Sequence, residues 1–187
     1  VRGRTINTMR RNLYRMAFIL LLALAVLASA APATARTGSD PALNSLAIPR
    51  GSVTSRPYAV MIDNHPRAYP QTGLNQAAIV FEALAEFGIT RYMAIYVPGI
   101  TPELQTIGPV RSARSYFVEW AKGLRGVYVH AGGAPDALTM ARTSVEIVDM
   151  DALRRNAGTA FRRSSARAAP HNLYTSSAAI ASFLEAQ

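Results

Sequence analysis

The hydrophobic pattern divides the chain into an apolar N-terminal stretch, a polar connecting segment and a region of short apolar runs. The first stretch, residues 17–28, carries no charge and follows five arginines at positions 2, 4, 10, 11 and 15. A positive start, an apolar stretch of about a dozen residues and small residues at 33–35 are typical of a secretory signal peptide. The stretch is shorter than the roughly 18–20 residues of a membrane-spanning helix. We therefore expect residues 1–35 to be a cleaved signal peptide, with an uncleaved membrane anchor as the alternative.

Residues 36–56 connect this stretch to the patterned region. They are rich in Pro, Gly, Ser and Thr without a sustained hydrophobic period, which indicates a linker. The remaining length suits one domain, which we expect over residues 57–187. Its last expected helix reaches Gln187 without a C-terminal glycine or a closing strand, so we expect a truncated product.

Four short apolar runs predict strands. Residues 57–63 end in a polar cluster, which is the pattern of a buried strand that runs into a loop. Residues 77–86 fit a helix or a strand, but Gly88 and the apolar run at 91–97 favour a hairpin of two strands. The fourth strand is expected at 127–130, directly before a glycine turn.

The first expected helix lies between the hairpin and the fourth strand. It begins at a serine cap, Ser112 or Ser115, and ends at Gly123 or Gly126. One side of this helix is expected to be buried, because four residues share the spacing of one helix face: Phe117, Trp120, Ala121 and Leu124.

Two further helices are expected after the fourth strand. One covers 137–141, with Pro135 suited to its first turn. The last covers 178–186, with a cap among residues 175–177, whereas residues 145–155 show no clear pattern. This order of strands and helices predicts an α/β domain, with α+β as the alternative, in which helices flank a single mixed sheet.

The charge balance at first suggests a nucleic-acid partner. Lys plus Arg number 20 against 11 Asp plus Glu, a formal net charge of +9. Five of the arginines belong to the expected signal, so the exported part holds 15 basic and 11 acidic residues, and no nucleic-acid partner is expected. Cysteine is absent, which excludes disulfides, thiolate metal sites and a cysteine nucleophile within this sequence.

The three histidines, His65, His130 and His171, lie in expected loops among polar or small residues. Histidine in such places acts as a general base, a metal ligand or an anion contact, or it ties loops together through its ring nitrogens. Asp63 with these histidines would offer ligands suited to zinc. Their spacing is uninformative and no H-E-x-x-H is present, so no metal and no cofactor is assigned.

An anion site has more support. Gly132 and Gly133 precede an expected helix start, where backbone N–H groups and the helix dipole favour a negative ligand. Arg111 and Arg114 lie at another expected helix start, where their charge opposes the dipole, so helix stability alone does not explain them. Arg91 opens an expected strand and would complete the site. The alternative is that these arginines form ion pairs with one of three glutamates: Glu82, Glu86 or Glu119.

Two enzyme classes receive little support from the pattern. No G-x-S-x-G sequence is present, so a serine hydrolase is not indicated. A carboxylate pair of Asp63 with Glu82 or Glu86 would suit glycoside hydrolysis only at a defined separation in space, which spacing along the chain does not show.

Several segments in one order carry a resemblance to a known family. They are Arg-Pro-Tyr-Ala-Val-Met-Ile-Asp-Asn-His-Pro (56–66), Pro-Gln-Thr-Gly-Leu (70–74), Phe-Glu-Ala-Leu-Ala-Glu (81–86), Gly-Ile-Thr-Arg (88–91), Ile-Gly-Pro-Val-Arg-Ser-Ala-Arg (107–114), Tyr-Val-His-Ala-Gly-Gly (128–133) and Ala-Pro-His-Asn-Leu-Tyr-Thr (169–175). Over about residues 55–180 the chain resembles the YerB-like lipoproteins, a bacterial envelope family known as a domain of unknown function. The resemblance implies an extracytoplasmic α/β domain followed by a smaller C-terminal domain that is missing here, and no established reaction. Because the lipobox cysteine of that family is absent, a soluble periplasmic or secreted form is expected.

We expect an exported cell-envelope protein that binds an anionic, phosphate-bearing envelope component. The alternatives are an envelope hydrolase or transferase that uses Asp63 and a histidine, with or without a metal, and a scaffold for an envelope protein. No catalytic residue is assigned, and membrane contact is expected only through an uncleaved signal. The expected ligand-binding residues lie in loops beside strand ends: Asp63, Asn64, His65, Arg91, Arg111, Ser112, Arg114, His130, Gly132, Gly133, His171 and Asn172.

Overall fold

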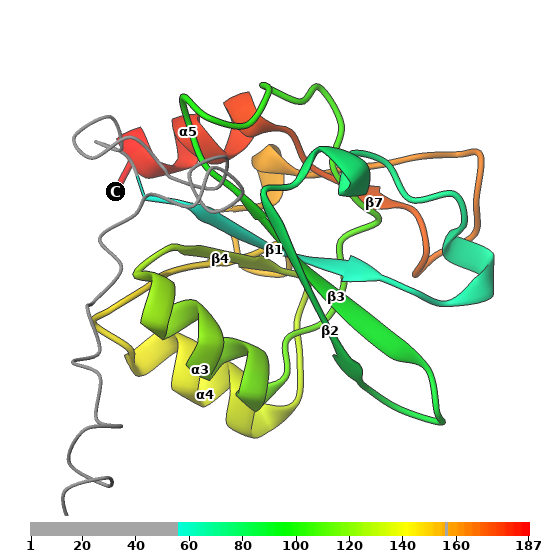
Figure 1. Cartoon of the computed structure of the whole chain (residues 1–187), viewed down its shortest axis with the longest axis horizontal. Helices are drawn as coiled ribbons and strands as arrows, with labels where there is room; N and C mark the ends of the chain where they lie inside the picture. Colours follow the sequence, from blue (N-terminus) through cyan, green and yellow to red (C-terminus); the bar gives the residue numbers. More distant parts are fainter. Residues whose placement is uncertain (1–55, 156) are drawn as a thin grey trace, which may run out of the picture. The chain divides into compact units, whose positions relative to one another are not determined.

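The computed structural model describes residues 56–155 and 157–187, which form a mixed five-stranded sheet with helices on both faces (Figure 1). The strands lie in the order β2-β3-β1-β4-β5, so β1 is central. All six residues of β1 are buried, as expected of a strand covered on both faces. The strands are β1 (Tyr58–Asp63), β2 (Ile79–Leu84), β3 (Thr90–Tyr96), β4 (Val127–His130) and β5 (Val148–Asp151).

The strand directions bring several chain ends to one edge of the sheet. β1 runs antiparallel to β3 and parallel to β4, and β4 runs parallel to β5. Asp63 at the end of β1 lies opposite Arg91 near the start of β3, and His130 at the end of β4 lies opposite Asp151 at the end of β5. The carboxyl ends of the three parallel strands therefore meet at the same edge, which is where open sheets with parallel strands bind ligands.

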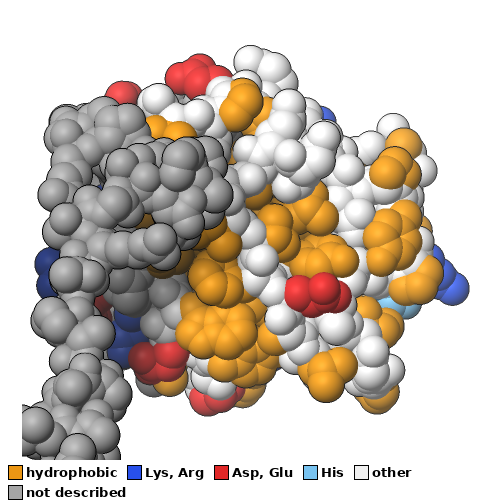
Figure 2. Space-filling view, in the orientation of Figure 1, with side chains coloured by type: hydrophobic (Ala, Val, Ile, Leu, Met, Phe, Trp, Pro, Cys, Tyr) orange, Lys and Arg blue, Asp and Glu red, His pale blue; other side chains and the backbone are white. Residues whose placement is uncertain are grey.

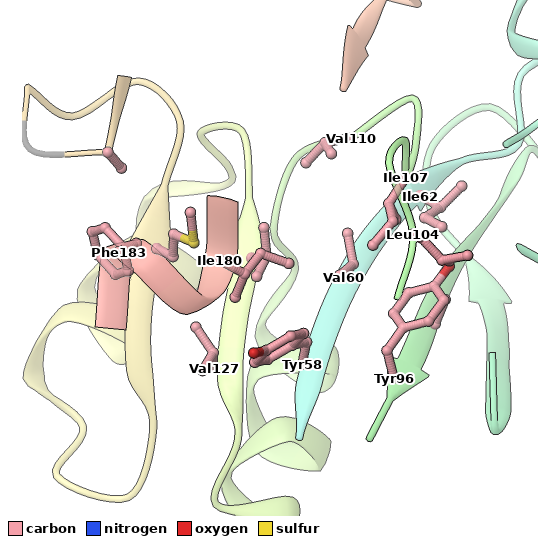
Figure 3. Close-up of a cluster of buried hydrophobic side chains, with 14 of the residues drawn as sticks. Tyr58, Val60, Ile62, Tyr96, Leu104, Ile107, Val110, Val127, Ile180 and Phe183 are labelled. Atoms are coloured by element: carbon pink, nitrogen blue, oxygen red, sulfur yellow. The ribbon is translucent and has the colours of Figure 1, made fainter. Parts of the chain in front are cut away.

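Three helices cover the sheet: α3 (Ser115–Leu124), α4 (Pro135–Thr143) and α5 (Ser177–Glu185). α3 and α4 lie side by side on one face, and α5 lies on the other (Figure 1). Met61 of β1 packs in the same cluster as Phe117 of α3. The next residue, Ile62, packs in the cluster that contains Ile180 of α5 (Figure 3). Successive side chains of a strand point to opposite faces, so the uninterrupted apolar run of β1 fills both halves of the core.

Shorter elements complete the described part: the 3-10 helices η1 (Pro66–Ala68), η2 (Leu74–Gln76) and η3 (Gly158–Ala160), and a two-stranded sheet of β6 (Arg162–Arg163) and β7 (Leu173–Tyr174). β7 lies beside the extended chain before α3. Val110 N–H donates to Leu173 O at 2.6 Å, and Ile107 and Thr175 exchange two backbone hydrogen bonds. These bonds fix the C-terminal segment next to residues 107–110.

The predicted fold class and most of the predicted elements are confirmed. Each of the four predicted strands is present, as β1 to β4, and the antiparallel hairpin beside parallel pairs makes the domain α+β. The helix predicted at 137–141 extends over Pro135–Thr143, with the proline in its first turn. The last helix begins after Ser176, whose hydroxyl accepts a hydrogen bond from Ala179 N–H at 3.1 Å.

The predicted start of the first helix is wrong. Neither Ser112 nor Ser115 caps α3; the N-cap residue is Arg114, and its side chain makes no capping hydrogen bond. The chain before it is held extended, because Ala113 pairs in parallel with Gly133 of the turn after β4.

The predicted end of this helix is also wrong. The C-cap is Arg125, which adopts the left-handed conformation with φ of 51°, and Gly123 lies inside α3. Gly126 serves a close approach instead, since a Cβ there would lie 2.6 Å from the carbonyl oxygen of Pro57. Trp120, which was expected on the buried face, is 39% exposed.

β5 is a strand that the pattern does not predict. It has only four residues and alternates Val148 and Met150 with two aspartates, so its apolar signal is weak. Its conformation comes from pairing with β4 over residues 148–151.

Apolar side chains are exposed along β2, which is an edge strand in the described part of the chain (Figure 2). Ile79 and Leu84 are exposed on the strand, and Phe87 is fully exposed at the tip of the hairpin. Phe81 packs on Trp120 of α3 with ring centroids 5.6 Å apart. This aromatic contact ties the edge strand to the helix layer.

The predicted signal peptide, residues 1–35, lies outside the described residues, and so does the predicted linker apart from Arg56. In the part that the structure describes, no helix has the length and apolar character needed to cross a membrane.

Candidate functional site

Residues 107–114 cross the ends of β1 and β4 and bring two arginines to this edge. Arg111 N–H donates to Met61 O at 2.9 Å, and Arg111 O accepts from Ala131 N–H at 3.0 Å. The backbone is therefore hydrogen-bonded to both neighbouring strand ends. Arg111 lies next to Asp63 as a result, and α3 begins directly after Arg114.

Asp63 is the centre of the first polar cluster. Its side chain is 1% exposed, and Oδ2 lies 2.7 Å from His171 Nδ1 and 3.1 Å from Arg111 Nε. Oδ1 accepts from His65 N–H at 3.0 Å. A buried carboxylate requires such partners to offset the loss of water. Asp63 thus joins the end of β1 to the chain before α3 and to the C-terminal segment.

His65 lies against the ring of His171. The two ring centroids are 4.4 Å apart and the planes are inclined by 22°. His65 Nδ1 accepts from Arg67 N–H at 3.1 Å, which fixes the ring at the start of η1. One face of the His171 ring is therefore covered by a held side chain.

Asn64 uses both of its polar atoms within the protein. Its Oδ1 accepts from the Tyr69 hydroxyl at 2.5 Å and from Gln71 Nε2 at 3.2 Å. Its Nδ2 donates to Thr90 Oγ1 at 2.6 Å, and Thr90 donates to Glu82. Tyr69 and Gln71 also line an open hollow of about 640 Å³. Asn64 holds the wall of this hollow in the present arrangement.

Arg91 and Arg114 share the carboxylate of Glu86. Arg91 Nη2 lies 3.6 Å from Glu86 Oε2, and Arg114 forms an ion pair with Oε1. Arg91 Nη1 also donates to the backbone oxygen of Ser112 at 3.2 Å, so Ser112 contributes its carbonyl to the cluster. The ion pairing that was left open as an alternative is thus made by Glu86 for these two arginines.

Positive charge is in excess around the start of α3. Burial lowers the pKa of Arg91, the charge of Arg111 lowers it further, and Asp63 acts in the opposite direction. Arg91 is 4% exposed, and its Nε has no hydrogen-bond partner among the described residues. Of the carboxylates that pair with these arginines, Asp63 is buried, whereas Glu86 is partly exposed to water, which screens its charge. The N-terminus of α3 adds its own partial positive charge.

His130 belongs to a second, separate cluster. It is completely buried, with Nε2 2.7 Å from Asp149 Oδ1 and Nδ1 2.9 Å from Gly132 O. Asp151 Oδ1 accepts from Gly132 N–H at 2.8 Å. Both ring nitrogens are engaged by acceptors, so His130 has no nitrogen left for a ligand. The cluster locks the turn after β4 to the end of β5.

The glycine turn before α4 is explained by close backbone contacts. The N–H of Gly132 was expected to face an anionic ligand, but it donates a hydrogen bond to the carboxylate of Asp151. A Cβ on Gly133 would lie 2.9 Å from the Cβ of Ala113, so only glycine fits without a shift. Ala134 N–H donates to Ala113 O at 3.4 Å.

Asn172 ties its own loop together. Its Nδ2 donates to the backbone oxygens of Ser164 at 2.9 Å and Arg167 at 3.0 Å. Its Oδ1 accepts from Arg163 Nη1 at 2.8 Å. These bonds fix the loop that presents His171.

The proposed zinc ligands divide between the two clusters: Asp63, His65 and His171 lie in the first and His130 in the second. Within residues 56–155 and 157–187, no group of three or more His, Asp or Glu side chains is placed to hold a metal ion.

Sequence reasoning missed Asp149 and Asp151, because it did not predict β5. It also missed Tyr128, whose ring lies 5.0 Å from that of His130. Burial raises the pKa of the Tyr128 hydroxyl, and the nearby backbone and charge of Arg114 lower it. Among the described residues, the hydroxyl has no hydrogen-bond partner of good geometry. Strand alternation was the available signal, since residues 128 and 130 of one strand share a face.

Comparison with known proteins gives the chain a family context. The chain is 41% identical over 151 residues to "Putative lipoprotein YerB" of Bacillus subtilis (strain 168), a match that covers 79% of this chain and 43% of that protein. The crystal structure of the YerB protein from Bacillus subtilis matches with a TM-score of 0.64 and 43% identity, over 71% of this chain and 44% of that one. The chain therefore spans less than half the length of these relatives.

The resemblance inferred from the motifs is confirmed by the family match. The sequence model described as "Protein of unknown function (DUF3048) N-terminal domain" matches residues 44–187, which include all the motifs named above. The chain belongs to this family, as a representative of its N-terminal domain.

Proposed function

We propose that this domain is an extracytoplasmic envelope protein that binds a phosphate-bearing envelope component through Arg91, Arg111 and Arg114. The excess of guanidinium charge over buried carboxylate at the start of α3 carries the proposal. Guanidinium groups suit this ligand because they form paired, charge-assisted hydrogen bonds to phosphate oxygens.

The exposure of the arginines supports separate roles for them. The side chains of Arg111 and Arg114 are 24% and 18% exposed, so a ligand can reach both. Arg91 is buried, so it contributes its charge without being reached by the ligand. Glu86 is 42% exposed and forms a weak surface pair, which a doubly charged phosphate would replace at little cost.

The proposed location rests on two observations. Residues 17–28 are apolar and follow five arginines, as in an export signal. The similar protein from Bacillus subtilis is named a lipoprotein. We propose export through residues 1–35 and a periplasmic or secreted location.

Vesicle binding tests the proposed ligand. The full chain is added to phosphatidylcholine vesicles with and without polyprenyl phosphate, and the difference removes any contribution of the apolar segment. Arg114→Gln removes one charge-assisted hydrogen-bond donor, which is worth about 1.5–3 kcal/mol. Binding should therefore weaken roughly ten- to hundredfold. Inorganic pyrophosphate, measured by calorimetry, shows whether the phosphate group alone is sufficient.

Arg155→Gln is the matched control, because Arg155 is an exposed arginine in the turn after β5. It should bind like the unchanged protein, and Arg114→Lys should bind with intermediate affinity, since lysine keeps the charge but loses the paired geometry. Equal weakening by Arg155→Gln and Arg114→Gln, or no binding of either probe, would show that the arginine cluster is not the site.

A further inference from the structure

We propose that Asp63 and His171 form an acid–base pair that hydrolyses the phosphate ester or anhydride held by the arginine cluster. The inference rests on the proposed function, because the substrate is the anion bound beside Arg111. His171 is the catalytic residue in this proposal, and Asp63 is a positioning residue.

The pair is joined to the arginine cluster through one atom. Asp63 Oδ2 lies 2.7 Å from His171 Nδ1 and 3.1 Å from Arg111 Nε. The imidazole and the guanidinium group are therefore neighbours across a single carboxylate oxygen. A phosphate bound by Arg111 would lie close to the histidine ring.

The contact with Asp63 selects the tautomer of His171. A carboxylate only accepts hydrogen bonds, so Nδ1 carries the proton in the neutral ring and Nε2 keeps its lone pair. The hydrogen bond found for this ring in the described part of the chain is the one at Nδ1. The side chain is 9% exposed, so it is held in the protein without being sealed from solvent. This is the arrangement of a general base.

The ring is held in position before any ligand arrives. Asp63 binds one edge, and the His65 ring covers one face at 4.4 Å. A base with a fixed orientation loses little entropy when it reacts.

His130 shows what a purely structural histidine looks like in the same fold. It also faces an aspartate, Asp149, at 2.7 Å, but its other nitrogen lies 2.9 Å from Gly132 O and the side chain is completely buried. Neither nitrogen of His130 is available to a substrate. His171 differs in both respects.

The proposed step uses water as the second reactant. His171 Nε2 takes a proton from a water molecule while the water oxygen bonds to phosphorus and the bond from phosphorus to the leaving oxygen breaks. The imidazolium then releases its proton to the solvent, which restores the neutral ring, and the leaving oxygen takes a proton from the solvent. Asp63 stabilises the imidazolium in between, and Arg111 and Arg114 stabilise charge on the phosphoryl oxygens. An ester substrate yields inorganic phosphate and an alcohol, and an anhydride substrate yields two phosphate groups, one of which can remain attached to the lipid.

His171→Asn separates catalysis from structure. The asparagine Nδ2 can replace the Nδ1–H donor to Asp63, but no group replaces Nε2. The full chain is assayed for phosphate release from inorganic pyrophosphate and from polyprenyl pyrophosphate in phosphatidylcholine vesicles. The two arms distinguish a soluble substrate from a lipid-borne one. We expect release to fall about 10²- to 10⁴-fold in His171→Asn, with binding of both probes unchanged and Arg155→Gln fully active.

The outcomes separate this inference from the proposed function. Binding by the unchanged protein without phosphate release overturns the inference and leaves the proposed function in place. Release by His171→Asn at the rate of the unchanged protein also overturns it, and the absence of binding overturns both proposals.

A nitrogen-15 NMR spectrum of the histidine rings provides a test that does not depend on the variant folding. In the unchanged protein, the neutral ring of His171 should carry its proton at Nδ1 and none at Nε2. A ring protonated at Nε2 in the neutral form overturns the proposal.

Discussion

Replacing Asp63 by asparagine tests the central contact of the site most directly. The shape is kept, but the charge and one acceptor atom are lost. If the new amide NH₂ faces His171 and Arg111, His171 loses its hydrogen-bond acceptor and Arg111 loses its ion-pair partner; if it faces the other way, His65 N–H loses its partner at 3.0 Å. No orientation of asparagine satisfies all three groups.

The size of the effect follows from burial. Breaking a buried ion pair by removing one partner costs about 3–5 kcal/mol. Arg111 is 24% exposed, so water compensates part of its charge, and we expect a loss of about 2–3 kcal/mol in the free energy of unfolding. Most of this loss comes from stranded donors rather than from lost packing.

Urea unfolding followed by the fluorescence of Trp120, which is the single tryptophan, measures this change. The midpoint should fall while the slope stays constant, because the surface exposed on unfolding does not change. Glu103→Gln, at an exposed carboxylate, should leave the midpoint nearly unchanged. A loss below about 1 kcal/mol for Asp63→Asn, the size of an exposed pair, would refute the view that Asp63 holds this edge together.

Two further predictions concern the backbone and the core. Gly133→Ala should lower the free energy of unfolding by about 1–3 kcal/mol, because the new Cβ would lie 2.9 Å from the Cβ of Ala113. The control is Gly123→Ala, whose Cβ would have no neighbour within 4 Å and which should not destabilise the protein. Equal effects of the two substitutions in urea unfolding would contradict this prediction. Burial raises the pKa of Tyr96, whose hydroxyl donates to Gly73 O at 3.0 Å. Because the folded-state pKa is the higher one, this stability is complete below the ordinary tyrosine value of about 10 and is lost as the pH rises above it. The free energy of unfolding should therefore fall between neutral and strongly alkaline pH, and less steeply in Tyr96→Phe; identical slopes would refute the assignment.

Strands and helices whose sequence signals span only a few residues could be predicted. The apolar run at 57–63 predicts a buried strand because a strand covered on both faces needs apolar residues at every position. Ser176 indicates the start of the last helix, because a capping hydrogen bond spans only three residues. The start of α3 was missed because Ala113 is held extended by Gly133, a partner that local sequence does not reveal.

The candidate site shows the same division. The candidate residues could be identified from the sequence, because histidines, arginines and Asp63 lie in loops beside predicted strand ends. The contacts between these residues could not be predicted from the sequence. His130 looks equivalent to His171 in sequence, but it lies in a different cluster with both ring nitrogens engaged.

The sequence by itself determined the strands and helices with strong hydrophobic periods, the membership of the family and the set of polar residues available for chemistry. Only the tertiary structure decided that His171 pairs with Asp63, which lies 108 residues away, that Arg91 and Arg114 share Glu86, and that Gly132 is occupied by Asp151. The physical reason is that periodicity and capping act over a few residues. The separation of distant side chains depends on strand order and register, and burial of the whole core sets both of these.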